Sequence, residues 1–111
     1  MERPNPYREL LQKILKKYAS IPYSYGEINS RVIISQDRNH FLLVKEGWEG
    51  KKHIHHCLVH AEIRGDKIWI HYDGIEDSIT EELVNAGISK DRIVLAFHPP
   101  YIREQTDYAP A

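Results

Sequence analysis

Two extended segments joined at Gly65 and Asp66 constrain the fold of this chain most strongly. Aliphatic side chains occupy every second position of residues 59–63 and 68–70, which is the period of a β-strand. Gly65 can take the positive φ that a two-residue hairpin turn requires. The sequence therefore predicts strands over residues 53–63 and 67–72 in which Ile63 pairs with Ile68. A slip of one residue would turn every side chain to the other face, so this register is a specific prediction.

The register sorts the side chains of the hairpin onto two faces. The pairs on the aliphatic face are Ile63–Ile68, Ala61–Ile70 and Val59–Tyr72. The pairs on the other face are His60–His71 and Glu62–Trp69. An indole on the less apolar face is either covered by another layer or belongs to an interface, where tryptophan is enriched. The sequence leaves both alternatives open for Trp69.

An amphipathic helix is predicted over residues 6–19. Its apolar residues recur at the spacing of one helical face, and they are Tyr7, Leu10, Leu11, Ile14, Leu15 and Tyr18. Asn5 can cap the first turn, and Pro6 suits the first helical position. Pro22 disfavours a helical Ile21, so the helix should end near Ser20, with residues 23–26 as a connection.

The remaining pattern predicts a second hairpin, a second helix and a last strand. Strands over 27–35 and 41–44 should flank a turn at 37–39 and lie inside the sheet, because both contain apolar neighbours in sequence. Gly47 and Gly50 should bracket Trp48 in another turn. Ser78 should cap a helix that runs to Ala86, with Gly87 closing it. Residues 92–97 form the last predicted strand, and the tail over 103–111 has little to bury.

These elements predict one α+β domain over residues 1–111. We expect the amphipathic N-terminal helix and the shorter second helix to pack on a mainly antiparallel sheet of about five strands. The composition, 41% hydrophobic and 28% charged, is typical of a globular chain. No apolar run approaches the roughly 20 residues of a membrane span, and a single cysteine excludes an internal disulfide. We therefore expect a cytoplasmic protein that does not enter a membrane.

The histidine-rich segment raises the possibility of a metal site. His53, His55, His56 and His60 precede the turn, and His71 follows it. Strand alternation should separate the first four onto opposite faces, and no zinc-type spacing such as CxxC or HExxH occurs. Only His60 and His71, with Glu62 or Asp73 as a third ligand, could form a site. We therefore expect no metal and no other cofactor.

The sequence also lacks a recognisable catalytic group. Cys57 lies beside His56, but the two should point to opposite faces, so a small core thiol is expected there. The carboxylates near Asp77 suit a helix N-terminus, and no phosphate-binding loop accompanies them. A metal-assisted nuclease or other hydrolase would depend on the surroundings of His60, His71 and Asp73. We expect no catalytic residue and no enzyme.

Binding of another macromolecule is the expected function. Candidate partner-binding residues are Trp48, His60, Glu62, Trp69, His71 and Arg103. A candidate basic patch on the first helix consists of Arg8, Lys13, Lys16 and Lys17. Fifteen basic against sixteen acidic residues give a net charge of −1, which favours a protein partner over direct DNA binding. A sheet face that carries aromatic groups also favours a homo-oligomer such as a dimer.

Several stretches resemble one known family. They are HAEI at 60–63, GDKIWI at 65–70, DGIED at 73–77, EELV at 81–84 and FHPP at 97–100, with Tyr7–Leu10, Tyr25–Glu27 and Gly47–Trp48 also matching. In this order they resemble the XisI family of fdxN-element excision controlling factors of cyanobacteria. The chain departs from the family pattern at His71, where Gln is expected, and at Ile75, where Thr is expected. The first departure further weakens a metal site at His71.

The resemblance implies a role in programmed DNA rearrangement. A member of this family would assist a separate site-specific recombinase in excising a DNA element during heterocyst differentiation. It would not itself perform the reaction. The resemblance also implies a companion excision factor, an XisH-like protein, as partner. It carries over no functional residue by position.

Overall fold

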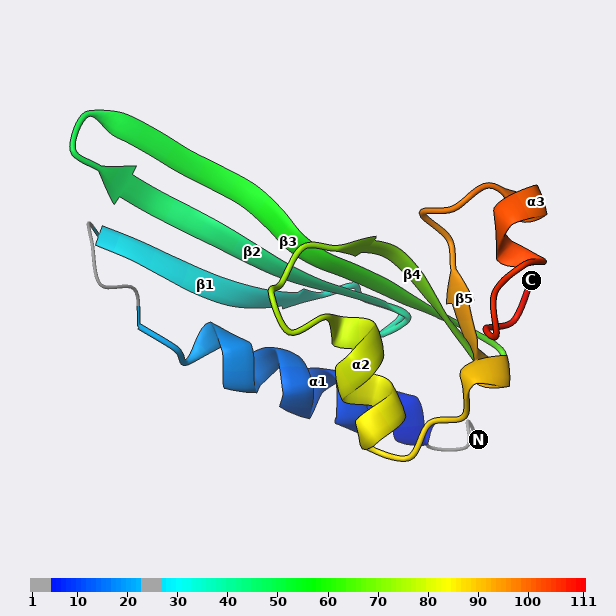
Figure 1. Ribbon diagram of the computed structural model, residues 1–111. Helices are drawn as coiled ribbons and strands as arrows, with labels where there is room; N and C mark the ends of the chain where they lie inside the picture. Colours follow the sequence, from blue (N-terminus) through cyan, green and yellow to red (C-terminus); the bar gives the residue numbers. More distant parts are fainter. Residues whose placement is uncertain (1–4, 23–26) are drawn as a thin grey trace.

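The computed structural model describes residues 5–22 and 27–111 and confirms the predicted α+β fold (Figure 1). Its elements are α1 (Pro6–Ala19), β1 (Glu27–Ile34), β2 (His40–Glu49), β3 (Lys52–Arg64), β4 (Lys67–Asp73), α2 (Ile79–Asn85), the 3₁₀ turn η1 (Lys90–Arg92), β5 (Ile93–Leu95) and α3 (Pro100–Arg103). The sheet has the order β1-β2-β3-β4-β5, and among the strand pairs of the described residues only β4–β5 is parallel. The predicted connection over residues 23–26 lies outside the described residues.

α1 begins and ends as the sequence predicts, and α2 begins at its predicted cap and ends at Asn85, one residue before the predicted end at Ala86. The Asn5 side chain accepts a hydrogen bond from the Tyr7 N–H at 2.9 Å, and α1 ends at Ser20. At α2 the Ser78 hydroxyl accepts from the Glu81 N–H, and Gly87 follows with a φ of 103°. These caps satisfy backbone groups that a helix end otherwise leaves unpaired.

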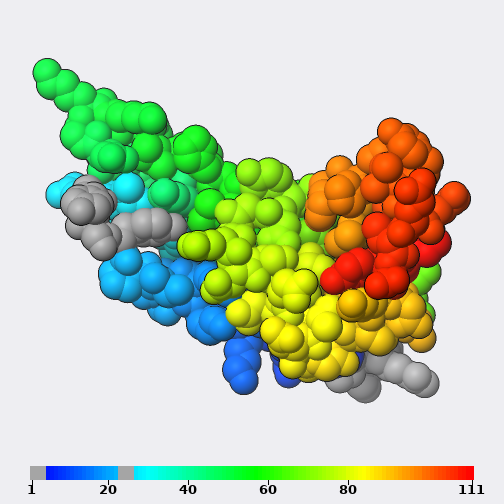
Figure 2. Space-filling model, in the orientation of Figure 1, coloured from blue at the N-terminus to red at the C-terminus, as the bar shows by residue number. Residues whose placement is uncertain are grey.

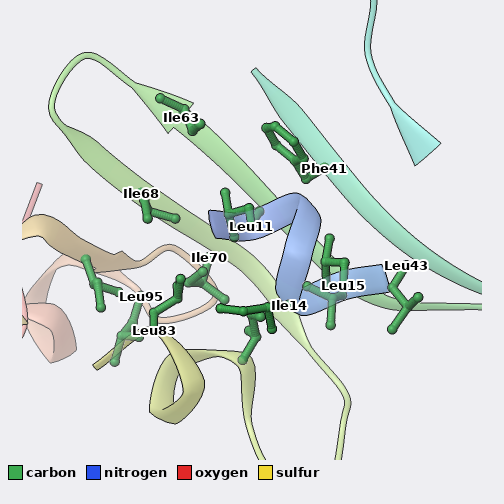
Figure 3. Packing of buried hydrophobic residues seen from close by; sticks show 14 residues of the cluster. Leu11, Ile14, Leu15, Phe41, Leu43, Ile63, Ile68, Ile70, Leu83 and Leu95 are labelled. Carbon is green, nitrogen blue, oxygen red and sulfur yellow. The ribbon is translucent and has the colours of Figure 1, made fainter. Parts of the chain in front are cut away.

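The two helices cover the same face of the sheet and leave the other face open (Figure 1). Side chains from α1, α2 and the covered face form one buried cluster (Figure 3), which comprises Leu11, Ile14, Leu15, Phe41, Leu43, Val59, Ala61, Ile63, Ile68, Ile70, Ile79, Leu83, Ile93 and Leu95. A fully buried leucine or isoleucine stabilises the fold by about 2 kcal/mol relative to an exposed one. We call the opposite side of the sheet the open face.

Two predictions about the first hairpin are wrong. β1 is an edge strand rather than an interior one, and Ile33 is 48% exposed, because no layer of the described residues covers the open face above it. β2 continues through Gly47 and Trp48 to Glu49, so Trp48 lies in a strand and not in a turn. Gly47 instead allows the backbones of β1 and β2 to lie close together, since a Cβ there would meet the Glu27 carbonyl oxygen at 1.9 Å.

A bulge in β4 modifies the predicted register of the central hairpin, and a second bulge interrupts the pairing of β3 with β2. The pairs Ile63–Ile68, Glu62–Trp69 and Ala61–Ile70 are confirmed, but His60 pairs with Tyr72 and Val59 with Asp73. His71 is thus an extra residue in β4, as Leu58 is in β3. An extra residue reverses the alternation beyond it, so a strand pattern extended across it fails.

The Leu58 bulge explains why Cys57 is exposed and not a core residue. Beyond it, Ile54 takes a buried position, while Cys57 pairs with Val44 and His53 with Trp48. The bulge therefore turns Cys57, His53 and His55 to the same open face as His60. The sequence predicted that His53 and His55 lie on the face opposite to His60, and that prediction is wrong.

The C-terminal tail is part of the fold, contrary to expectation. β5 is shorter than predicted, and its residues Ile93, Val94 and Leu95 are all buried. Ala109 forms a parallel bridge to Val94 and is itself 5% exposed. The tail thereby extends the sheet beyond β5.

No helix among the described residues has the length and apolar character of a membrane span.

We expect Gly47→Ala to destabilise the protein by about 3 kcal/mol, because its Cβ would overlap backbone atoms of β1 that cannot rotate away. Chemical denaturation would measure the change. Gly50→Ala is the control, since nothing lies within 4 Å of its Cβ and only the positive φ of 63° opposes it, at about 1 kcal/mol. Equal destabilisation by both variants would contradict the close approach of β1.

A candidate interface on the open sheet face

Glu62 is the centre of a charged cluster on the open face. Arg64 Nη2 donates to its Oε1 at 3.0 Å, and His71 Nε2 donates to the same oxygen at 2.8 Å. His40 Nε2 lies 3.6 Å from the other oxygen. The hydrogen bond from Arg64, supported by that from His71, lowers the pKa of Glu62 to about 2, although burial opposes the shift. Glu62 is therefore ionised throughout the neutral range.

Three histidines adjoin Glu62 and interact with one another. His40 Nδ1 and His60 Nε2 are 3.1 Å apart, so one ring donates a hydrogen bond and the other accepts it. The rings of His60 and His71 have centroids 4.8 Å apart. Burial, with the neighbouring His71 and His40, lowers the pKa of His60. His60 and His71 are thus neighbours as predicted, although the bulge removes them from direct register.

This geometry does not form a metal site. The His40 and His60 nitrogens face each other, and His71 faces Glu62, so their lone pairs do not converge on one point. Within residues 5–22 and 27–111 no group of three or more His, Cys, Asp or Glu side chains could hold an ion. Asp73, the alternative third ligand, instead accepts from the Ile79 N–H at 2.9 Å and from the Ser78 hydroxyl at 2.7 Å, at the start of α2.

Two arginines lie close to the Trp69 ring at the end of this cluster. The Arg64 guanidinium lies 4.1 Å from the indole centroid and that of Arg103 lies 5.6 Å away. Arg103 also donates to the His98 carbonyl at 3.0 Å and to the Pro110 carbonyl at 3.1 Å. Trp69 is half-buried, and the guanidinium groups of these two arginines cover part of its ring. The tail thus helps to form the open face.

The predicted partner-binding residues separate into two groups. His60, Glu62, Trp69, His71 and Arg103 lie together, and we call them, with His40 and Arg64, the Glu62–Trp69 cluster. Trp48 lies at the far end of β2, where its ring packs against that of His53 in a tilted arrangement, with centroids 4.7 Å apart. Eight residues of extended strand separate it from His40, a distance of about 26 Å. Trp48 is 52% exposed and belongs to a different part of the surface.

The structure assigns two of the four predicted basic-patch residues to internal contacts. Arg8 donates to the Arg38 carbonyl at 3.1 Å and to Asn39 Oδ1 at 3.2 Å, which ties α1 to the β1–β2 turn. Lys17 pairs with Glu82 of α2 at 3.2 Å. Lys13 and Lys16 are exposed. The predicted patch is thus reduced to two exposed lysines on the helical side, away from the open face.

The sequence interpretation missed two members of the cluster and the shape around it. His40 was not included because the strand was expected to begin at Phe41, yet the β2–β3 register places His40 opposite Glu62. Arg64 was assigned to the turn. Figure 2 shows this side of the molecule as a saddle between the β2–β3 hairpin and the C-terminal segment, where Phe97 and Tyr101 are 45% and 66% exposed.

A separate pocket of about 350 Å³ lies on the helical side of the sheet. It is lined by Tyr18, Ile21, Pro22, Leu43, Leu58, Gly74, Ile75, Glu76 and Asp77. The Tyr18 hydroxyl donates to Glu82 at 2.7 Å and lies 3.2 Å from Asp77. Burial and these carboxylates raise the pKa of Tyr18, so its hydroxyl stays protonated. None of the predicted site residues lines this pocket.

Comparisons with known proteins agree with the resemblance in the sequence. The family model described as XisI protein matches residues 1–110. The chain is similar to the crystal structure of a XisI-like protein from Anabaena variabilis ATCC 29413, with 36% identity, a TM-score of 0.85 and coverage of 95% of this chain and 96% of that one. It is also similar to the fdxN element excision controlling factor XisI from the same organism, with 37% identity, a TM-score of 0.76 and the same coverage. No curated protein matches the chain.

We expect Glu62→Gln to destabilise the protein by about 2 kcal/mol at pH 7 and progressively less at acidic pH. The folded state holds the pKa of Glu62 near 2, against an ordinary value of 4.5. Its contribution to stability is therefore complete above pH 4.5 and is lost as the pH falls toward 2. Denaturation of both proteins across this range would measure the difference.

Glu104→Gln, at an exposed position after α3, is the matched control and should change stability little at any pH. A difference between wild type and Glu62→Gln that stays constant from pH 7 to pH 2 would contradict the charged contacts of Glu62.

Proposed function

The chain belongs to the XisI family, and from this membership we propose that it is a controlling factor for the excision of a DNA element. A similar structure bears the name fdxN element excision controlling factor XisI, which supports this role. In this proposal the chain assists a separate recombinase in programmed DNA rearrangement. The setting is the cytoplasm of a cyanobacterium during heterocyst differentiation.

We infer that the chain acts by binding a protein partner through the open face. The observation that carries this inference is the Glu62–Trp69 cluster itself. Tryptophan and arginine are the residues that most often dominate protein interfaces, and Trp69 here lies close to both Arg64 and Arg103. Arg64 and His71 already hold Glu62 in place, so little side-chain entropy remains to be lost on binding.

The chemistry of Glu62 and Cys57 supports a regulatory subunit rather than an enzyme. A carboxylate with a pKa near 2 is a poor general base at neutral pH. The Cys57 thiol donates to the Val59 carbonyl at 3.3 Å, and burial raises its pKa, which disfavours the reactive thiolate. The proposal therefore assigns no catalytic residue, metal or cofactor to the chain.

The proposed partner is the companion excision factor, an XisH-like protein. Direct DNA binding is the second candidate and would use the exposed Lys13 and Lys16. A net charge of −1 disfavours it, since autonomous DNA binders usually present a strongly basic surface. The internal contacts of Arg8 and Lys17 weaken it further.

We expect Trp69→Ala and Tyr72→Ala each to lower the affinity for the companion factor at least about tenfold. Tyr72 lies beside His60 on the open face and is 52% exposed, so its removal should leave the fold intact. Calorimetric titration would measure the affinity, and circular dichroism would confirm that each variant folds.

The control is Lys13→Glu with Lys16→Glu, which alters only the helical side and should leave that affinity unchanged. Unchanged binding by both open-face variants would contradict the proposed interface. A band-shift at low salt tests the second candidate. Retention of DNA by the chain alone, lost in the lysine double variant, would favour direct DNA binding instead.

A further inference from the structure

The two edges of the sheet differ in how they are protected. At the β5 edge, Ala109 forms a bridge to Val94, so the tail pairs with part of that strand. At the other edge, β1 runs from Glu27 to Ile34, and no strand or bridge of the described residues lies beyond it. Figure 1 shows β1 as the outermost strand on its side. Unpaired backbone N–H and C=O groups make such an edge a template for another strand.

β1 lacks most devices that keep an edge strand from pairing. It contains no proline, and its pairing with β2 runs through all eight residues without a bulge. It is also longer than the typical short edge strand. Exposed and half-buried residues alternate along it, so its open side and its helix side are distinct. A partner strand must therefore place its own exposed residues on the open side.

The charges on the exposed side of β1 indicate which strand fits. Glu27 and Arg31 are both exposed, lie on the same side of the strand and have opposite charge. Neither forms an ion pair within the described part of the chain. An antiparallel strand with the charge order of β1 itself would bring an acid opposite each base. The strand that meets this condition by symmetry is β1 of a second copy.

We propose that two copies of this chain associate through antiparallel pairing of their β1 strands, which would join the two sheets into one. In a register centred on Asn29, each Glu27 lies directly opposite the partner's Arg31. Centring on the next residue makes the two side chains diagonal neighbours, which long side chains still bridge. Centring on Arg31 would instead oppose two guanidinium groups. The contact is isologous, so it closes as a dimer and leaves the open face available.

Sedimentation velocity of the full chain tests this contact, at concentrations up to about 0.5 mM because small interfaces are weak. Wild type should show a concentration-dependent monomer–dimer equilibrium. Arg31→Glu opposes two pairs of carboxylates, and Glu27→Arg opposes two pairs of guanidinium groups. Each single variant should therefore dimerise at least about tenfold more weakly than wild type. Mixed in equal amounts, the two variants should form a heterodimer, and the double variant should regain the homodimer.

Matched controls carry the same changes of charge at exposed sites away from β1. Lys51→Glu in the β2–β3 turn changes charge as Arg31→Glu does, and Glu104→Arg changes it as Glu27→Arg does. Both controls should dimerise as wild type does. A wild type that stays monomeric, a dimer unaffected by Arg31→Glu, or a variant mixture that does not associate would each overturn the proposal.

Discussion

Burial of one aliphatic sheet face beneath α1 and α2 is the interaction on which the rest of the structure depends. The residues of that face and the apolar stripes of the two helices form a single buried cluster. The hydrophobic effect is proportional to the apolar area removed from water, so this contact supplies most of the stabilisation of the domain. Because the helices cover one side only, the other side of a five-stranded sheet stays open. The position of the candidate interface follows from that asymmetry.

The two bulges connect this packing to the open face. The extra residue Leu58 keeps Val59 buried and lets Ile54 occupy a buried position further along β3, at the expense of simple alternation. Without this bulge, strand alternation would turn Ile54 to the open face. The extra residue His71 in β4 lies between the buried Ile70 and Tyr72, which pairs with His60 and is 52% exposed. The His71 bulge also places the His71 side chain against Glu62, so this backbone irregularity shapes the candidate interface.

The C-terminal segment forms one side of a saddle-shaped surface on the open face of the sheet (Figure 2). The guanidinium groups of Arg64 and Arg103 both lie close to the Trp69 ring, and the hydrogen bonds of Arg103 to His98 and Pro110 fix its position. The long β2–β3 hairpin forms the opposite side of the saddle (Figure 2). A radius of gyration of 15.0 Å, compared with roughly 13 Å for a compact chain of this length, agrees with this extended outline. The interface proposed for a protein partner is thus built from the consecutive strands β2, β3 and β4 and from α3, which is distant from them in sequence.

The sequence by itself determined the elements and the short-range pairings. It determined α1 with its Asn5 cap, α2 with its Ser78 cap, the turn at Gly65, and the pairing of Glu62 with Trp69. These follow from local rules, namely helical periodicity, capping and the geometry of a tight turn. Only the tertiary structure decided that β1 is an edge, that Cys57 is exposed, and that His40, Arg64 and Arg103 join Glu62 and Trp69. These features depend on strand order, on bulges and on a C-terminal tail that packs against strands distant from it in sequence. A bulge cannot be read from the sequence pattern, because a single extra residue resets the alternation of the strand.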